Sequence, residues 1–442
     1  MSPFFRRSRI VSGLAALVFF AAGCSAPGVA TDAVSDAVSG TAGIASTAAA
    51  TLDATTVHSI ALTVDDEARK AMIQTYLGSG EKEWISGSVT IDGQRFENVG
   101  IKLKGNSTLR GITVDTPAQD LPLRIRLDKY VDGQQWSGLS DFAVRANSSE
   151  TSMNEAVALD LLADAGLAST QAIATRFSVN GGDATLRLTV QNLDDAWVRE
   201  NFPDAGADSV LYKAESEGNW SWRGADGDYS TAFDIEAGAD NYQPLVELLD
   251  LLNNGTDEEL AAKLPTLVDL DSFATYLAFQ EIIDNVDDID GPGNNSYLFW
   301  DSATGKFTVV AWDHNLAFGA SMGGGGFGGA GGPRGAGGQG GGRPAGMPEG
   351  MTAPEGGFPG GGQAGGGMMA RSNPLVTAFK ANAEWTALYD TALSDLKASL
   401  LTGGALTRSV DAWSATLTAG ASDLVPADTV TSEADAIRKF AG

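Results

Sequence analysis

A long glycine-rich segment places the strongest constraint on how this 442-residue chain can fold. Residues 323–367 consist mainly of glycine with proline, alanine and methionine, and they show no hydrophobic periodicity. Such a composition buries too little apolar surface to offset the entropy lost on ordering the chain. A phosphate-binding loop is not indicated, because that motif needs a strand before it, a helix after it and a fixed spacing. We therefore predict a disordered insertion over residues 321–370.

Outside this segment the sequence is that of an acidic globular protein. Hydrophobic residues make up 43% of the chain, which is enough for one large domain or two ordinary ones. The 29 Lys and Arg residues are outnumbered by 56 Asp and Glu residues, so the formal net charge is -27. Because such a charge repels phosphate backbones, we do not expect nucleic acid as a partner.

The N-terminus predicts export and attachment to a membrane. Three arginines precede an apolar run that ends in small residues before Cys24, the only cysteine of the chain. This pattern is typical of a signal peptide over residues 1–24 and is too short for a spanning helix. The run FAAGC resembles a bacterial lipobox, although Ala21 stands where leucine is commoner. We predict that Cys24 is lipidated and that the protein is an extracytoplasmic lipoprotein anchored to the cell membrane. The alternative is ordinary cleavage that leaves an incidental thiol.

Hydrophobic periodicity predicts strands first and helices later. Alternating residues indicate strands at 84–91, 97–104, 122–130, 175–179, 185–191, 296–300 and 306–312. Helical spacing and caps predict helices at 151–165, at 242–285 with breaks at NNGT and near Pro265, and at 373–401. We predict an α+β fold with a flexible linker at 25–57, a β-rich N-terminal and core part at 58–320, and a helical C-terminal part at 371–442.

The acidic stretch DNVDDIDGPGNN at residues 284–295 is the strongest candidate for a functional loop. A calcium-binding EF-hand needs oxygen ligands at positions 1, 3 and 5, glycine at position 6 and glutamate at position 12. Aligning Gly291 with position 6 puts Val286 at position 1 and Tyr297 at position 12. The EF-hand template therefore fails at two ligating positions.

A phosphoryl-transfer site is the other interpretation of this stretch. That chemistry needs a carboxylate to orient the attacking hydroxyl, and oxygen ligands a little further on to hold Mg²⁺ against phosphates. Either Asp287 or Asp290 can supply the carboxylate, and Asn295 with Asp313 can supply the ligands. The spacing from Asp290 to Asn295 is the D-x-x-x-x-N of kinase catalytic loops. The residues alone leave both aspartates open.

Six segments taken together resemble the CotH kinase family, atypical kinases similar to spore coat protein H. In chain order they are IKLKGNSTLR, PLRIRLDKY, SSETSMNEAVALDLL, LTVQNLDDAWVRENF with VLYKAE, DNVDDIDGPGNNSYLFWD, and KFTVVAWDHNLAFG with NPLV. They run in family order over roughly residues 58–400. The resemblance implies an atypical protein-kinase-like fold that binds ATP with Mg²⁺ or Mn²⁺. It implies an enzyme, a phosphotransferase that acts on Ser or Thr of an exported protein.

The resemblance also implies roles for individual residues. Asp287 matches the acidic residue of the family's Asn-x-Asp element, so we prefer it to Asp290 as the catalytic residue that orients the acceptor hydroxyl. Asn295 matches the family's metal-holding asparagine before an aromatic strand. Asp313 matches the first aspartate of the motif W-D-x-D-x-x-(F/W)-G and is the second predicted metal ligand.

The cofactor-binding residues follow from the same comparison. Lys104, in KGNS, is the candidate to neutralise the nucleotide phosphates, and Glu155 on the following helix is its predicted ion-pair partner. Rival cations for this role are Arg124, Arg126 and Lys213.

Two positions depart from the family pattern. His314-Asn315 stands where the family carries an apolar residue and a second aspartate, which removes one anionic ligand, and Ser296 replaces an aromatic residue. Either activity is reduced or Asn315 coordinates through its carbonyl. The alternative function is therefore a non-catalytic, pseudokinase-like surface or adhesion module that binds a ligand or Ca²⁺.

Overall fold

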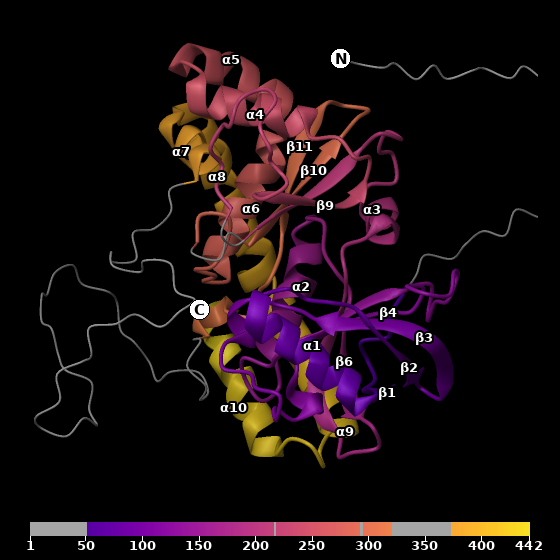
Figure 1. Cartoon of the computed structure of the whole chain (residues 1–442). Coiled ribbons are helices and arrows are strands. Elements are labelled where there is room, and N and C mark those ends of the chain that lie inside the picture. The colour runs from indigo at the N-terminus through magenta and orange to yellow at the C-terminus, as the bar shows by residue number, and fades with distance from the viewer. Residues whose placement is uncertain (1–50, 216–217, 292–294, 321–372) are drawn as a thin grey trace, which may run out of the picture. The chain divides into compact units, whose positions relative to one another are not determined.

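The computed structural model describes residues 51–215, 218–291, 295–320 and 373–442 (Figure 1). The predicted signal peptide with Cys24, most of the predicted linker and the predicted glycine-rich insertion lie outside these residues. A β-rich N-terminal part and a helical C-terminal part confirm the α+β class. The kinase-like character of the fold stays a prediction.

Seven of the described strands form a closed barrel. They are β1 (His58–Val64), β2 (Ile85–Ile91), β3 (Gln94–Leu103), β4 (Leu123–Arg126), β5 (Asp141–Val144), β6 (Ala172–Val179) and β7 (Thr185–Gln191). Their order is β1-β2-β3-β4-β5-β7-β6, and β6 closes the barrel by pairing parallel to β1. Alternate residues such as Leu123 and Ile125 point into the interior, which Val, Ile, Leu and Phe side chains fill.

Helix α1 (Asp66–Ser79) joins β1 to β2 and packs on the barrel core. Asp65 caps its N-terminus by accepting a hydrogen bond from the Ala68 N–H, and Gly80 ends it in the left-handed region with φ 81°. Met72 and Ile73 are its buried residues and belong to the core of the barrel.

A smaller antiparallel sheet has the strand order β11-β10-β8-β9. Its strands are β8 (Val210–Ala214), β9 (Phe233–Gly238), β10 (Ser296–Asp301) and β11 (Lys306–Ala311). One face, which includes Tyr212 and Leu298, packs in the large helical core. The opposite face, which includes Leu211 and Phe299, packs with helix α3 (Asp195–Asn201).

The remaining helices build the large core around this sheet. They are α2 (Met153–Asp164), α4 (Gln243–Asn254), α5 (Asp257–Leu267), α6 (Leu270–Ile282), α7 (Pro374–Ala381), α8 (Ala383–Leu396), α9 (Ala405–Gly420) and α10 (Ala427–Arg438). Helix α2 is buried along most of its length and contacts β6, α9 and α10. Across the described ranges, no helix is both long enough and apolar enough to cross a bilayer.

The structure contains a helix break near each of the two predicted places, but the second does not fall at the proline itself. The break at NNGT is found between α4 and α5, where Thr256 and Glu259 form a capping box. Pro265 instead lies inside α5, which continues to Leu267. The break follows at the next residues, and Asp269 then caps α6.

A single carboxylate oxygen of Asp160 joins α2 to α9. This oxygen, Oδ2, accepts hydrogen bonds from Ser409 Oγ at 2.6 Å and from Trp413 Nε1 at 2.8 Å. Burial raises the pKa of Asp160, and the two hydrogen bonds oppose that shift only in part. A neutral carbonyl oxygen at this position would keep both bonds without a buried charge.

We expect Asp160→Asn to be at least as stable as the wild type near neutral pH, and Asp160→Ala to lose about 1–3 kcal/mol of unfolding free energy. Asparagine keeps an acceptor for both donors, whereas alanine leaves them unpaired. Because the folded-state pKa is raised, the wild-type carboxyl stabilises the fold when protonated and loses that contribution as pH rises through its folded-state pKa. The advantage of asparagine should therefore grow from about pH 4 to about pH 7 in urea unfolding. A constant difference between the two proteins would contradict the raised pKa.

Candidate functional site

Asp287 and Asn295 are in direct contact. Asp287 lies in the loop after α6, and Asn295 immediately precedes β10. The side-chain amide nitrogen of Asn295 donates to Oδ2 of Asp287 at 3.0 Å and to its backbone carbonyl at 3.1 Å. Both bonds use the same nitrogen, so the side-chain carbonyl oxygen of Asn295 remains an acceptor that can face a cation.

Asp290, the other aspartate that the loop spacing left open, holds a helix terminus instead. Its Oδ1 accepts a hydrogen bond from the Asn373 N–H at 2.7 Å, at the start of α7. Its Oδ2 lies 3.9 Å from Nζ of Lys380. These contacts give Asp290 a structural task at the start of α7.

Asp313 and Asn295 flank the same end of the β10–β11 hairpin. Ser296 of β10 pairs with Ala311 of β11, so Asn295 and Trp312 each lie one step beyond that pair. Asp313 follows with φ 63°, in the left-handed region, which aspartate tolerates better than most residues. The hairpin therefore carries both predicted metal ligands at one end.

Arg145, a residue that the sequence analysis did not single out, bridges Glu155 and Asp313. Its guanidinium is 2.8 Å from Oε1 and 3.0 Å from Oε2 of Glu155, and it also pairs with Oδ1 of Asp313. Burial opposes the charge of Arg145, but the carboxylates of Asp313 and Glu155 outweigh it and raise the pKa of Arg145. Burial also raises the pKa of Glu155, which Arg145 counteracts.

This bridge corrects the predicted pairing of Lys104 with Glu155. Glu155 is only 4% exposed and its carboxylate is taken by Arg145. One sequence feature could have pointed to Arg145: it directly follows the strand DFAV, whose four residues are all buried, so a charged side chain there is expected to need a partner. Periodicity alone did not reveal its partners, which lie 10 and 168 positions away.

Lys104 and Arg145 both lie close to the ring of Trp312, the residue before Asp313. Its Nζ donates to Oδ1 of Asn192 at 2.9 Å and lies 5.0 Å from the ring centroid of Trp312. The guanidinium carbon of Arg145 lies 5.5 Å from the same ring. Burial lowers the pKa of Lys104 to about 7, and repulsion from Arg124 adds to that shift.

The three rival cations all have carboxylate partners. Arg124 pairs with Asp141 at 2.6 Å, Arg126 with Asp128 at 2.8 Å, and Lys213 with Glu215 at 3.0 Å. A phosphate would have to compete with a fixed carboxylate at each of them. Among the described residues, the hydrogen-bond partner of Lys104 is the neutral Asn192, so Lys104 is the best placed of the four cations to bind a phosphate.

The departures at His314 and Asn315 have structural consequences. His314 is fully buried without a hydrogen bond to either ring nitrogen, and burial lowers its pKa to about 4. The backbone carbonyl of Asn315 accepts bonds from Ser148 Oγ at 2.9 Å and from Asn154 Nδ2 at 2.7 Å. That backbone carbonyl ties the loop after β11 to α2. Coordination of a metal through the side-chain carbonyl of Asn315 stays a prediction.

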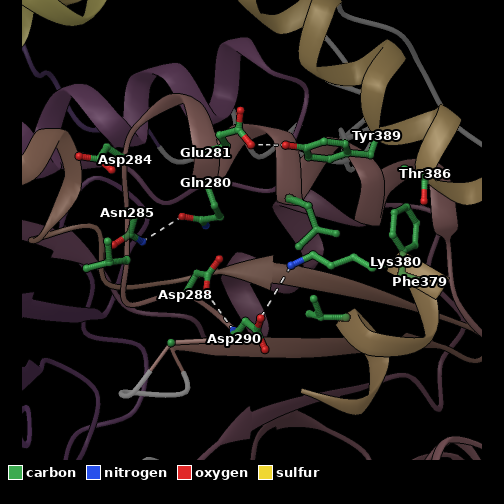
Figure 2. Close-up of a pocket in the computed structure, with 14 residues that line it drawn as sticks. Gln280, Glu281, Asp284, Asn285, Asp288, Asp290, Phe379, Lys380, Thr386 and Tyr389 are labelled. Carbon is green, nitrogen blue, oxygen red and sulfur yellow. Dashed lines mark hydrogen bonds and ion pairs between the residues drawn. The ribbon is translucent and has the colours of Figure 1, made fainter. Parts of the chain in front are cut away.

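An acidic pocket of about 580 Å³ opens beside the loop that carries Asp287 (Figure 2). Asp287 is not part of its lining, but its neighbours Val286 and Asp288 are. The charged lining residues are Glu281, Asp284, Asp288, Asp290 and Lys380, and the apolar wall comes from α6 and α7 through Leu277, Val376 and Phe379. Figure 2 shows Lys380 directed at Asp290 and the hydroxyl of Tyr389 at Glu281.

The donor set fits a hard divalent cation. Among the described residues no three His, Cys, Asp or Glu side chains gather to form a metal site. Magnesium, however, is typically held by one or two side-chain oxygens together with substrate phosphates. Arg145 uses Oδ1 of Asp313, so Oδ2 of Asp313 and the carbonyl oxygen of Asn295 are the two oxygens that would hold the cation.

The fold and this group of residues define an α+β protein with a candidate phosphate and metal site at one end of a small sheet. Comparison with protein families matches residues 101–430, most of the chain, to the family described as CotH kinase protein. The chain therefore belongs to the CotH kinase family, as its motifs predicted. The match begins within β3, later than the resemblance suggested, and extends into α10. A search of curated proteins finds no match.

We expect Arg145→Met to lower the unfolding free energy by about 3–5 kcal/mol, because it leaves the buried Glu155 and the neighbouring Asp313 without a counter-charge. Adding Glu155→Gln should restore part of that loss, since the buried negative charge then disappears. Urea unfolding of the two variants and of Glu155→Gln alone measures the coupling. Additive losses would show that Arg145 and Glu155 do not depend on each other.

Proposed function

We propose that this protein is an extracytoplasmic kinase that transfers the γ-phosphoryl group of ATP to Ser or Thr of an exported protein. The observation that carries the proposal is the gathering of Asp287, Asn295 and Asp313 near one end of the β10–β11 hairpin, in a member of the CotH kinase family. Lys104 lies over the ring of Trp312, which directly precedes Asp313.

In this mechanism each residue has a separate task. Asp287 accepts a hydrogen bond from the acceptor hydroxyl and orients it, while the amide of Asn295 holds the Asp287 carboxylate in place. Asn295 and Asp313 would hold Mg²⁺ or Mn²⁺, which neutralises charge on the nucleotide phosphates when bound. Lys104 donates to the phosphates from its position over Trp312. Catalysis then comes from positioning and electrostatic stabilisation.

The proposal includes a location outside the cytoplasm. Lipidation of Cys24 would anchor the protein to the membrane, and residues 25–57 would space the kinase part from it. The motif around Cys24 and the apolar run before it support this part of the proposal.

One contact favours the non-catalytic alternative. Arg145 already neutralises Oδ1 of Asp313, and Asn315 supplies no second carboxylate. A surface module that binds a ligand without phosphoryl transfer would tolerate both features. Nucleotide binding and transfer must therefore be measured separately.

The acidic pocket supports a place for the acceptor polypeptide. It adjoins the Asp287 loop, and four carboxylates outnumber its one lysine. Its apolar wall suits the methylene stem of a long cationic side chain. We propose that an acceptor segment with Lys or Arg near the phosphorylated hydroxyl docks there.

We expect thermal unfolding to shift upward more when ATP and Mn²⁺ are present together than when either is present alone. A hundredfold excess over Kd should add about 2.7 kcal/mol of stability. Asp313→Asn should abolish the part of the shift that Mn²⁺ adds, because it removes a metal ligand. Asp287→Asn should keep the shift and lose transfer of labelled phosphate, because Asp287 acts on the acceptor.

Asp395→Asn, on the exposed surface of α8, is the control for the loss of one negative charge. It should preserve both the shift and the transfer. A wild type that shows no shift with ATP and Mn²⁺ would overturn the kinase proposal and favour the non-catalytic module.

We expect Asp284→Asn to raise KM for an arginine-containing serine peptide about fivefold to tenfold, because a charge-assisted contact is lost. KM for ATP and kcat should stay near the wild-type values, since Asp284 lines the acidic pocket and is not among the residues proposed to bind the metal, the phosphates or the acceptor hydroxyl. Asp271→Asn, at the other end of α6, is the matched control. Equal KM values for Asp284→Asn and Asp271→Asn would exclude the pocket as the acceptor site.

A further inference from the structure

Three lysines near the end of β3 differ from the other half-buried lysines of the described chain. Lys82, Lys102 and Lys104 are half-buried, yet none of them forms an ion pair with a described carboxylate. By contrast, Lys70 and Lys213 each pair with a glutamate, at 3.1 Å and 3.0 Å. A half-buried ammonium without a carboxylate is costly unless an anion is present.

The partners of the three lysines are neutral. Lys82 Nζ donates to Oδ1 of Asn106 at 2.7 Å, and Lys104 Nζ donates to Oδ1 of Asn192 at 2.9 Å. Lys102 Nζ lies 4.8 Å from the ring centroid of Trp84. These contacts hold each ammonium in place without neutralising it. Each group therefore keeps donors for an incoming anion.

The three lysines lie around the end of β3. Lys102 lies in β3, and Lys104 directly follows the strand, where its N–H donates to the Pro122 carbonyl in continuation of the pairing with β4. The two lysines therefore share a face, while Leu103 between them packs in the barrel core. Lys82 reaches Asn106, two residues beyond Lys104. Gly105 makes the turn between them with φ 101°, a conformation that favours glycine.

The surrounding charges explain why the three groups are poised for an anion. Burial lowers the pKa of all three lysines, and repulsion from other cations adds to the shift, from Lys213 at Lys82 and from Arg124 at Lys102 and Lys104. The charged groups that act on them are Arg124 of β4, Asp141 of β5, Lys213 of β8, Glu215 directly after β8, and Glu236 of β9. Arg124 pairs with Asp141 and Glu236, and Lys213 pairs with Glu215, so these carboxylates are already engaged.

We propose that Lys82, Lys102 and Lys104 together form one subsite for an oligophosphate, which is the triphosphate of the bound nucleotide. The inference rests on the proposed function and adds Lys82 and Lys102 to its phosphate-binding residues. Three ammonium groups can each contact oxygens of successive phosphoryl groups, whereas a single orthophosphate reaches fewer of them. The subsite therefore selects for chain length and recognises tripolyphosphate even without a base or a metal.

Binding of sodium tripolyphosphate to the purified protein without nucleotide or divalent metal tests this subsite. Titration calorimetry and thermal unfolding should show binding that orthophosphate at equal ionic strength does not reproduce. Lysine pKa values that are lowered in the free protein rise beside an anion, so binding at about pH 8 should take up protons. Calorimetry in two buffers of different ionisation enthalpy measures that uptake.

Lys82→Gln and Lys102→Gln should each weaken tripolyphosphate binding about tenfold or more, the effect of losing one charge-assisted contact. Both ligand-free variants should melt at or above the wild-type temperature, because a crowded cation is removed. Lys70→Gln is the matched control and should bind as the wild type does. Absence of tripolyphosphate binding, or equal binding by all three variants, would overturn the subsite.

ATP with Mn²⁺, measured on the same proteins, separates this inference from the proposed function. If Lys82→Gln and Lys102→Gln bind ATP with the same affinity as the wild type, the subsite is overturned and the kinase proposal stays intact. If the protein binds tripolyphosphate but does not bind ATP with Mn²⁺, the three lysines form an oligophosphate site, but its assignment to a nucleotide triphosphate is overturned together with the kinase proposal.

Discussion

The guanidinium of Arg145 holds together three parts of the fold that are distant in sequence. Arg145 follows β5 of the barrel, Glu155 lies in the first turn of α2, and Asp313 follows β11 of the small sheet. Two carboxylates, one of them buried, approach each other closely only because one cation lies between them. The placement of α2 against the barrel and the sheet depends on this pairing, and so does the orientation of Asp313.

Several hydrogen bonds fix the loops that adjoin Arg145, Glu155 and Asp313. The backbone carbonyl of Asn315 is held by Ser148 and by Asn154 of α2. Glu433 of α10 accepts bonds from Ser149 Oγ at 2.8 Å and from the Glu150 N–H at 3.0 Å. Glu433 lies beyond the residues that match the family. The C-terminal helix therefore fixes the loop that leads into α2 and contributes to the site without touching a substrate.

Charge is distributed unevenly around the candidate site. Arg124, Arg145 and Lys213 are matched by carboxylates, whereas Lys102 and Lys104 have neutral partners. Carboxylates predominate in the pocket beside the Asp287 loop. In a protein with a net charge of -27, a local excess of cations requires a structural cause. Here that cause is the alternation along β3 and the residue after it, which directs Lys102 and Lys104 away from the barrel core.

Much of the local structure, and part of the site, could be predicted from the sequence. Alternation identified the strands of both hairpins and helical spacing identified α2, because side-chain periodicity follows directly from backbone geometry. The motifs also indicated Asp287, Asn295 and Asp313, which lie close to one another in the chain. Closure of the barrel by β1 and β6, and the partners of Arg145 and Asp160, were decided only by the tertiary structure. Those contacts join residues far apart in sequence, and no local pattern specifies which buried charge meets which.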